Sequence, residues 1–408
     1  MPAVPDAAEV ATRHGLVQYY HAELAPRQIS NIKPKVFIVS MFDPEAEVWW
    51  AIPEFDLLAK NVSVPGFSPL FPEAHCTSDG EICQLVTGEG EINAAVTLTA
   101  LFTSGLFDLT ETYFLVAGIA GISPEVGTLG SVTFARFAVQ VALQYEFDYR
   151  EVPQNWTTGY IPQGSYFPDE YPGELYGTEV FEVNEALRDL AMSFASKAAL
   201  NDSETAVAYR ANYGGASLYT AGAKPPSVVA CDTATSDVYW SGALLGEAFA
   251  NFTQVVTNGT GVYCTTQQED NATLEALMRA AKTKLVDFSR IVVMRTASDF
   301  DRPYPGQKPL DNLLYADVGG FEPSIQNIYL AGVKIVEGIL GGWNSTFKAG
   351  VKAENYLGDI FGTLGGEPDF GPGSDFDNGY TKRSLQGRGA QRKKRGVAKR
   401  GIAMRLKH

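Results

Sequence analysis

Short apolar runs that end abruptly in polar or glycine-rich turns are the feature that most constrains the fold of this chain. Four of them fit buried β-strands, at residues 35–41, 112–118, 227–230 and 291–294. Between them, apolar residues recur at helical spacing, at residues 87–104, 184–199, 271–289 and 325–340. This alternation predicts an α/β fold with a central, mixed but mostly parallel sheet flanked by helices.

Length and composition predict one folded domain with two extensions. With 408 residues and 45% hydrophobic content, the chain can bury a large core. We expect an irregular extension at residues 1–32, a single α/β domain at residues 33–358, and a disordered tail at residues 359–408 that is rich in Gly and Pro and then basic. The run Arg392–Arg395 fits a solvated tail better than a polyanion-binding patch.

The charge of the chain is unevenly distributed. The formal net charge is −15, and residues 382–408 hold 11 of the 32 Lys and Arg but no acid. The rest of the chain therefore has 21 bases against 47 acids. Because an acidic surface repels phosphate backbones, we expect no nucleic-acid partner and favour a neutral small ligand or a cationic partner.

Signals for the compartment conflict. No signal peptide is legible at the N-terminus, and the absence of any run of 18 apolar residues predicts no transmembrane span. Chance predicts roughly two Asn-x-Ser/Thr triplets in such a chain. The sequence has seven among its 15 Asn, at Asn61, Asn155, Asn201, Asn251, Asn258, Asn271 and Asn344. This excess favours a secreted or cell-surface glycoprotein.

The four cysteines are an even set and fit disulfides in a secretory compartment. Three pairings are open, and we favour Cys76 with Cys83 and Cys231 with Cys264. The alternative is four buried free thiols.

Common cofactor motifs are missing from the sequence. It has no Walker loop, no Gly-x-Gly-x-x-Gly with an acid about 20 residues on, and no His-Glu-x-x-His. With only four His, a zinc site or a Ser-His-Asp triad is poorly supplied. We therefore expect no metal and no nucleotide cofactor.

Six motifs at the ends of the expected strands carry the chemistry. In order they are Asp43-Pro-Glu-Ala-Glu47, Thr87-Gly-Glu-Gly-Glu-Ile-Asn-Ala-Ala95, Ala117-Gly-Ile-Ala-Gly121, Thr235-Ser-Asp-Val-Tyr-Trp240, Gln267-Gln-Glu-Asp-Asn-Ala272 and Thr296-Ala-Ser-Asp299. Each is weak alone, and Asp299 by itself fits a turn residue better than a catalyst. Polar residues at the carboxyl ends of parallel strands meet in one crevice, where open sheets bind ligands.

The ordered series resembles the nucleoside phosphorylase and nucleosidase superfamily, and more closely the fungal purine nucleoside permease family, over residues 34–358. The resemblance implies a single-domain phosphorylase-like fold, purine nucleosides as ligands, and N-glycosidic bond cleavage by water or phosphate. It implies no cofactor other than inorganic phosphate as a co-substrate, and a homo-oligomer. The alternatives are a nucleoside-binding component of uptake without catalysis, and a noncatalytic nucleoside sensor.

The resemblance assigns the purine-binding side of the site to two motifs. Asp299 becomes the acid at N7 of the purine, which makes the base a better leaving group, and Ser298 lies beside it at the base. Tyr239 becomes an aromatic contact of the base, and Trp240 reads the edge of the base through its backbone. Without the resemblance, both aromatic residues would be expected in the core.

The resemblance assigns the sugar and the nucleophile to the other motifs. Glu269 accepts hydrogen bonds from the ribose hydroxyls, and Gln268 lies beneath the sugar. Glu47, less firmly Asp43 or Glu45, orients the attacking water. The nucleophile or anion site is formed by Gly118, Ile119, Ala120 and Gly121. Ile119 stands where the superfamily usually has Ser or Thr, and this weak anion site favours hydrolysis, or binding without turnover.

Overall fold

The computed structural model describes residues 32–372, and the expectations for residues 1–31 and 373–408 lie outside the described part of the chain. Most of its strands join one 13-stranded sheet, and β8 and β9 form a separate two-stranded sheet. The strands are β1 (Val36–Ser40), β2 (Lys60–Ser63), β3 (Glu73–Cys76), β4 (Ile82–Val86), β5 (Tyr113–Ile122), β6 (Val132–Ala135), β7 (Phe137–Gln140), β8 (Gln144–Glu146), β9 (Tyr160–Pro162), β10 (Val180–Glu182), β11 (Val228–Ala230), β12 (Asp232–Thr235), β13 (Tyr263–Gln267), β14 (Ile291–Phe300) and β15 (Gly358–Asp359).

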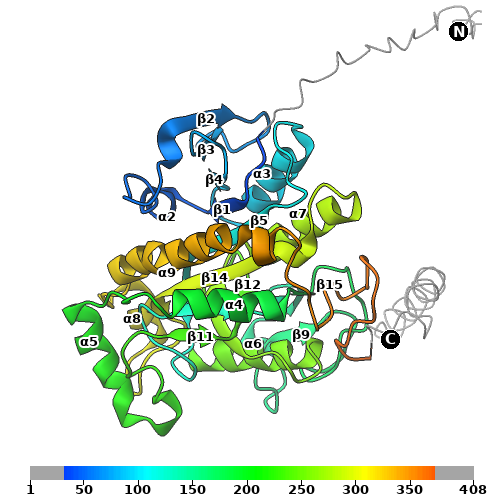
Figure 1. The fold of residues 1–408 in the computed structure, drawn as a ribbon. Coiled ribbons are helices and arrows are strands. Elements are labelled where there is room, and N and C mark those ends of the chain that lie inside the picture. Colours follow the sequence, from blue (N-terminus) through cyan, green and yellow to red (C-terminus); the bar gives the residue numbers. More distant parts are fainter. Residues whose placement is uncertain (1–31, 373–408) are drawn as a thin grey trace, which may run out of the picture.

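The helices flank this sheet (Figure 1). They are α2 (Asp43–Glu47), α3 (Glu91–Thr103), α4 (Glu185–Ala195), α5 (Glu204–Arg210), α6 (Ala243–Val256), α7 (Asp270–Lys282), α8 (Pro309–Leu314) and α9 (Phe321–Gly341). The predicted α/β class and its mixed central sheet are therefore confirmed.

The sheet is mixed, with its parallel pairs at the centre. Strand β1 pairs in parallel with β4 and β5, and β5 pairs in parallel with β14. Antiparallel pairs dominate the edges, where β2 joins β3 and β15 joins β10. The sheet is thus less uniformly parallel than the sequence predicted.

Side chains of the central strands alternate between the two faces of the sheet, and helices cover both faces. Phe37 and Val39 of β1 belong to the apolar cluster that includes Leu98 of α3 and Leu277 of α7. The intervening residues, such as Ile38, belong to a second cluster with α4 and α9. Because successive side chains of a strand point to opposite faces, one apolar strand supplies both cores. Figure 1 shows α9 and α4 lying across one face of the sheet.

Strands β5 and β14 are longer than predicted, with ten residues each. The expected turn Ala117–Ile122 is strand, and Asp299 lies within β14 rather than beyond it. The pairing register shifts between Ala297 and Asp299, so Ser298 is an extra residue in β14. Such a bulge reverses the alternation of side chains.

The described fold continues beyond the predicted domain end at residue 358. Ile360 and Phe370 are fully buried in the cluster that contains Phe249 and Phe252 of α6. The start of the predicted disordered tail is therefore corrected, because residues 359–372 pack on the domain. Both favoured disulfides, Cys76–Cys83 and Cys231–Cys264, are present.

Candidate functional site

A cavity of about 440 Å³ lies at the carboxyl ends of the central strands. Residues from all six sequence motifs reach it or contact its wall. Its lining includes Glu45, Glu89, Ile119, Ala120, Gly121, Ser236, Tyr239, Trp240, Gln267, Gln268, Glu269, Arg295, Ser298 and Asp299. The predicted crevice therefore exists, and the motifs converge on it.

Asp299 projects into this cavity next to β5. Its Oδ2 lies 3.2 Å from the hydroxyl of Ser298. Burial raises the pKa of Asp299 to about 6, with a further increase from Asp301 and a decrease from the Ser298 hydroxyl. A Cβ atom at Gly121 would lie 2.7 Å from Oδ1 of Asp299, so a larger residue there would displace this carboxyl group. A carboxyl group with this pKa can donate a proton near neutral pH.

Glu269 lines the same cavity from the N-cap position of α7. Its Oε1 accepts a hydrogen bond from the Gly90 amide at 3.0 Å, and its Oε2 lies 3.1 Å from Nη2 of Arg295. Burial raises the pKa of this carboxyl group, and Arg295 lowers it. A carboxylate offers about four acceptor positions, so both oxygens can still accept from sugar hydroxyls. Gln268 lines the cavity beside it.

Glu45, not Glu47, is the acid of α2 that reaches the cavity. Its Oε2 accepts from the Met41 amide and its Oε1 from the Ile119 amide, both at 2.7 Å. Glu47 and Asp43 are exposed and do not line the cavity. Residues 43 and 47 share one face of this helix, whereas residue 45 lies on the opposite face. The acid of this motif that lines the cavity is therefore Glu45 and not the predicted Glu47, and burial raises the pKa of Glu45 to about 8.

Arg295 is a charged residue of the cavity lining that the sequence motifs did not include. Its guanidinium group is buried, lies 2.6 Å from Oδ1 of Asp270, and donates to the Ile119 carbonyl at 3.1 Å. A Cβ atom at Gly118 would lie 2.7 Å from both Nη1 of Arg295 and Oε1 of Glu45. The signal was present in the sequence, because Arg inside a buried apolar strand is rare unless it is paired.

The predicted anion site has no free main-chain donor at Ile119. Its amide is bonded to Glu45 and its carbonyl to Arg295. Ile119, Ala120 and Gly121 line the cavity, whereas Gly118 lies behind Arg295 and Glu45. The backbone here holds protein side chains rather than presenting donors to a ligand.

The two predicted aromatic residues both line the cavity. Tyr239 is 67% exposed at the mouth, and the ring of Trp240 packs edge-on against Phe249 at a centroid distance of 4.7 Å. Arg136 and Arg150 lie outside the lining: Arg136 bonds to Glu182, and Arg150 to Asp148.

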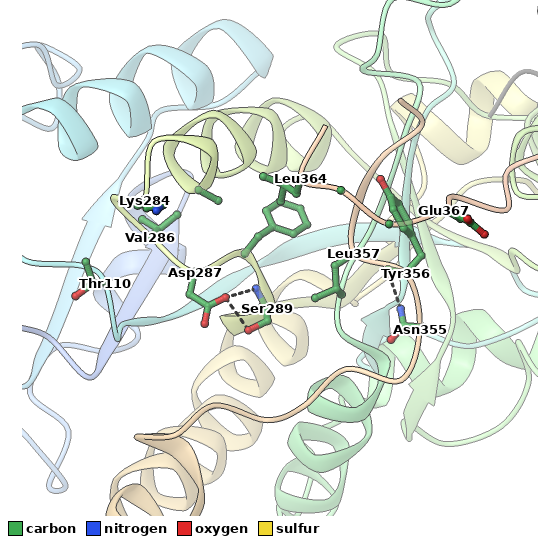
Figure 2. Close-up of a pocket in the computed structure, with 14 residues that line it drawn as sticks. Thr110, Lys284, Val286, Asp287, Ser289, Asn355, Tyr356, Leu357, Leu364 and Glu367 are labelled. Atoms are coloured by element: carbon green, nitrogen blue, oxygen red, sulfur yellow. Dashed lines mark hydrogen bonds between the residues drawn. The ribbon is translucent and has the colours of Figure 1, made fainter. Parts of the chain in front are cut away.

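Figure 2 shows a second cavity, of about 840 Å³, beside the segment Asn355–Glu367. Asp287 and Ser289 line it and precede β14, so it lies at the opposite end of that strand from Asp299. The Asp287 carboxylate is bonded to Ser289 and Arg290. Within residues 32–372, no cluster of His, Cys, Asp or Glu is arranged to hold a metal ion. The 440 Å³ cavity is the candidate site, because it is the one that residues of the six sequence motifs line.

Comparisons with known proteins agree with the sequence resemblance. The purine nucleoside permease family model matches residues 33–352. A purine nucleoside permease of Candida albicans is 49% identical over 345 residues, which cover 83% of each chain. A probable purine nucleoside permease of Schizosaccharomyces pombe is 43% identical over 323 residues, which cover 77% of this chain and 91% of the relative.

Similar solved structures include a 5′-methylthioadenosine/S-adenosylhomocysteine nucleosidase from Neisseria meningitidis, at 14% identity and a TM-score of 0.42, covering 76% of this chain and 98% of that chain. The futalosine hydrolase of Helicobacter pylori has 14% identity and a TM-score of 0.43, covering 74% and 97%. The family match and the two fungal relatives span most of the chain. The chain belongs to the purine nucleoside permease family.

Proposed function

We propose that the cavity binds purine nucleosides and cleaves their N-glycosidic bond with water. The observation that carries this proposal is the pair of carboxyl groups, Asp299 and Glu45, on the walls of one cavity with pKa values raised to about 6 and about 8. Both groups can exchange a proton near neutral pH, and the reaction uses the form in which Asp299 is protonated and Glu45 is ionised, which these pKa values make a minor form at pH 7.

In this mechanism Asp299 donates its proton to N7 of the purine while the C1′–N9 bond breaks. Glu269 accepts hydrogen bonds from the ribose hydroxyls and fixes the sugar between the two carboxyl groups. Water adds to C1′ and gives its proton to ionised Glu45. Arg295 lies next to Glu269 and Glu45 and keeps charge balanced at the sugar.

Hydrolysis is favoured over phosphorolysis by the charges of the cavity. Glu45, Glu89, Glu269 and Asp299 line it, and the one basic residue of the lining, Arg295, is bonded to Glu269 and Asp270. A phosphate ion would meet four carboxyl groups and an arginine that is already paired.

The test is to incubate the purified protein with inosine, guanosine and adenosine, with and without phosphate, and to measure free base and ribose 1-phosphate. Base release without phosphate supports hydrolysis. Base release that requires phosphate would show that phosphate, and not water, is the nucleophile. Saturable binding without release rejects cleavage.

Binding without turnover is the second candidate, because the fungal relatives are named permeases. Across residues 32–372 the structure has no helix with the length and apolar character of a membrane span. Such a protein would bind the nucleoside for a separate carrier, and the same assay separates the two functions.

We also propose that the protein acts as a homo-oligomer. Val238, Tyr239, Leu313 and Phe321 line the cavity with exposed apolar side chains, and a second copy would cover this mouth. Light scattering of the purified protein measures the assembly. We further propose secretion or display at the cell surface, supported by the Asn-x-Ser/Thr triplets and both disulfides.

A further inference from the structure

The amino end of α3 at the mouth of the cavity is bonded to the protein's own carboxylates. The Gly90 amide donates to Oε1 of Glu269 at 3.0 Å, and the Glu91 amide donates to Oδ1 of Asp237 at 2.9 Å. Free amides at the start of a helix bind phosphate groups readily. Here these two donors are already used, so the helix start does not offer them to an anionic ligand.

A second, shallow hollow of about 390 Å³ adjoins the ribose side of the cavity. It is lined by Glu89, Gly90, Ile92, Asn93, Asp237 and Gln268. Glu89 and Gln268 line both spaces. Under the proposed function Glu269 and Gln268 hold the ribose, so this hollow is open to a substituent of the sugar.

The charge of this hollow is negative. Glu89 and Asp237 line it, and neither residue has a role in the chemistry above. Burial, and then Asp237 and Glu269, raise the pKa of the neighbouring Glu91, so the carboxylates lie close enough to repel one another. No Lys or Arg lines the hollow. A phosphate group placed here would lose hydration and gain no counter-charge.

We propose that Asp237 and Glu89 determine specificity at the 5′ end of the substrate: they admit nucleosides with an uncharged 5′ group and exclude nucleoside 5′-phosphates. The inference deepens the proposed function and rests on its placement of the ribose. It also explains why the first amides of α3 are hydrogen-bonded to Glu269 and Asp237, since these carboxylates occupy donors that would otherwise attract phosphate.

The test measures binding of adenosine and of adenosine 5′-monophosphate by calorimetry, for the wild type, Glu89→Gln, Asp237→Asn and the double variant. Asn at position 237 keeps an oxygen that accepts from the Glu91 amide. The wild type should bind the monophosphate roughly 100-fold more weakly than adenosine, and each neutralisation should narrow that ratio roughly three- to tenfold. Glu247→Gln is the matched control, because Glu247 is an exposed acid of α6 that lines neither space.

Salt separates electrostatic exclusion from a change of shape. The Debye length falls from about 10 Å at 0.1 M salt to about 3 Å at 1 M, so the wild-type ratio should narrow in salt and that of the double variant should change little. Equal wild-type affinities, or a ratio that the two substitutions leave unchanged, would overturn the proposal.

The experiment distinguishes failure of the proposed cleavage from failure of the proposed exclusion of 5′-phosphates. Selective binding of adenosine without base release rejects cleavage and supports exclusion by Asp237 and Glu89. Base release from adenosine together with equal binding of the monophosphate supports cleavage and overturns the exclusion. Absence of binding for both ligands overturns both proposals.

Discussion

Replacing Glu45 by Gln should remove a pH-dependent destabilisation of the fold. Burial raises the pKa of Glu45 from an ordinary value of 4.5 to about 8, so the folded protein holds this proton more tightly than the unfolded chain. The stability that the protonated group contributes is fully present below about pH 4.5 and is lost as the pH rises to about 8. At about 1.4 kcal/mol per pH unit, the full shift corresponds to an upper bound of about 5 kcal/mol.

The effect between pH 5 and pH 8.5 should be smaller than this bound, because part of the stabilisation is already lost between pH 4.5 and pH 5. We expect the free energy of unfolding of the wild type to fall by about 2–4 kcal/mol relative to Glu45→Gln between pH 5 and pH 8.5. Urea denaturation of both proteins at the two pH values measures this difference.

Glu47→Gln is the matched control, since Glu47 is an exposed acid two residues away on the same helix. Its stability should follow that of the wild type at both pH values. If the Glu45→Gln curve runs parallel to the wild type, the carboxyl group does not hold its proton at neutral pH, and the raised pKa assigned to Glu45 is refuted.

Three further predictions concern activity and modification. Asp299→Asn should lower the rate of base release by roughly two to four orders of magnitude, and an unchanged rate in a steady-state assay would reject Asp299 as the acid. The pH profile of kcat/KM should be bell-shaped with limbs near pH 6 and pH 8, where Asp299 and Glu45 titrate; a flat profile between pH 5 and 9 would contradict these roles. Glycopeptide mass mapping of the secreted protein should find glycans at exposed sites such as Asn61 and Asn258 but not at Asn271, which is buried and bonded to Thr235. A glycan on Asn271 would contradict the placement of Glu269 at the cavity wall.

Much of the site could be predicted from the sequence because its residues follow strands. The apolar runs located β1, β5 and β14, and parallel pairing then brings their carboxyl ends together. The motifs that contain Glu269 and Asp299 line one cavity as expected. Strand direction fixes this proximity, and no side-chain detail is needed.

Features that depend on which face of a short helix a residue occupies, or on tertiary contacts, could not be predicted. The segment Asp43–Glu47 holds three acids in five residues, and a helix of little more than one turn gives no periodicity to choose among them. Arg295 directly follows the predicted strand at residues 291–294, and only tertiary pairing with Asp270 allows it to be buried there. The segment at residues 359–372 is rich in Gly and Pro, yet Ile360 and Phe370 find apolar partners far away in sequence.

The extra residue in β14 sets the directions in which the side chains of Arg295 and Asp299 point. Arg295 pairs with Gly118, and Asp299 pairs with Gly121, although an unbroken strand would pair Asp299 with Ile122. Glycines 118 and 121 are three apart and so lie on opposite faces of β5. The bulge thereby places Asp299, the proposed acid at the purine, and Arg295, proposed to act near the sugar, on opposite faces of a single strand. Deleting Ser298 would return both side chains to one side of the sheet, so this one extra residue sets the directions of Arg295 and Asp299.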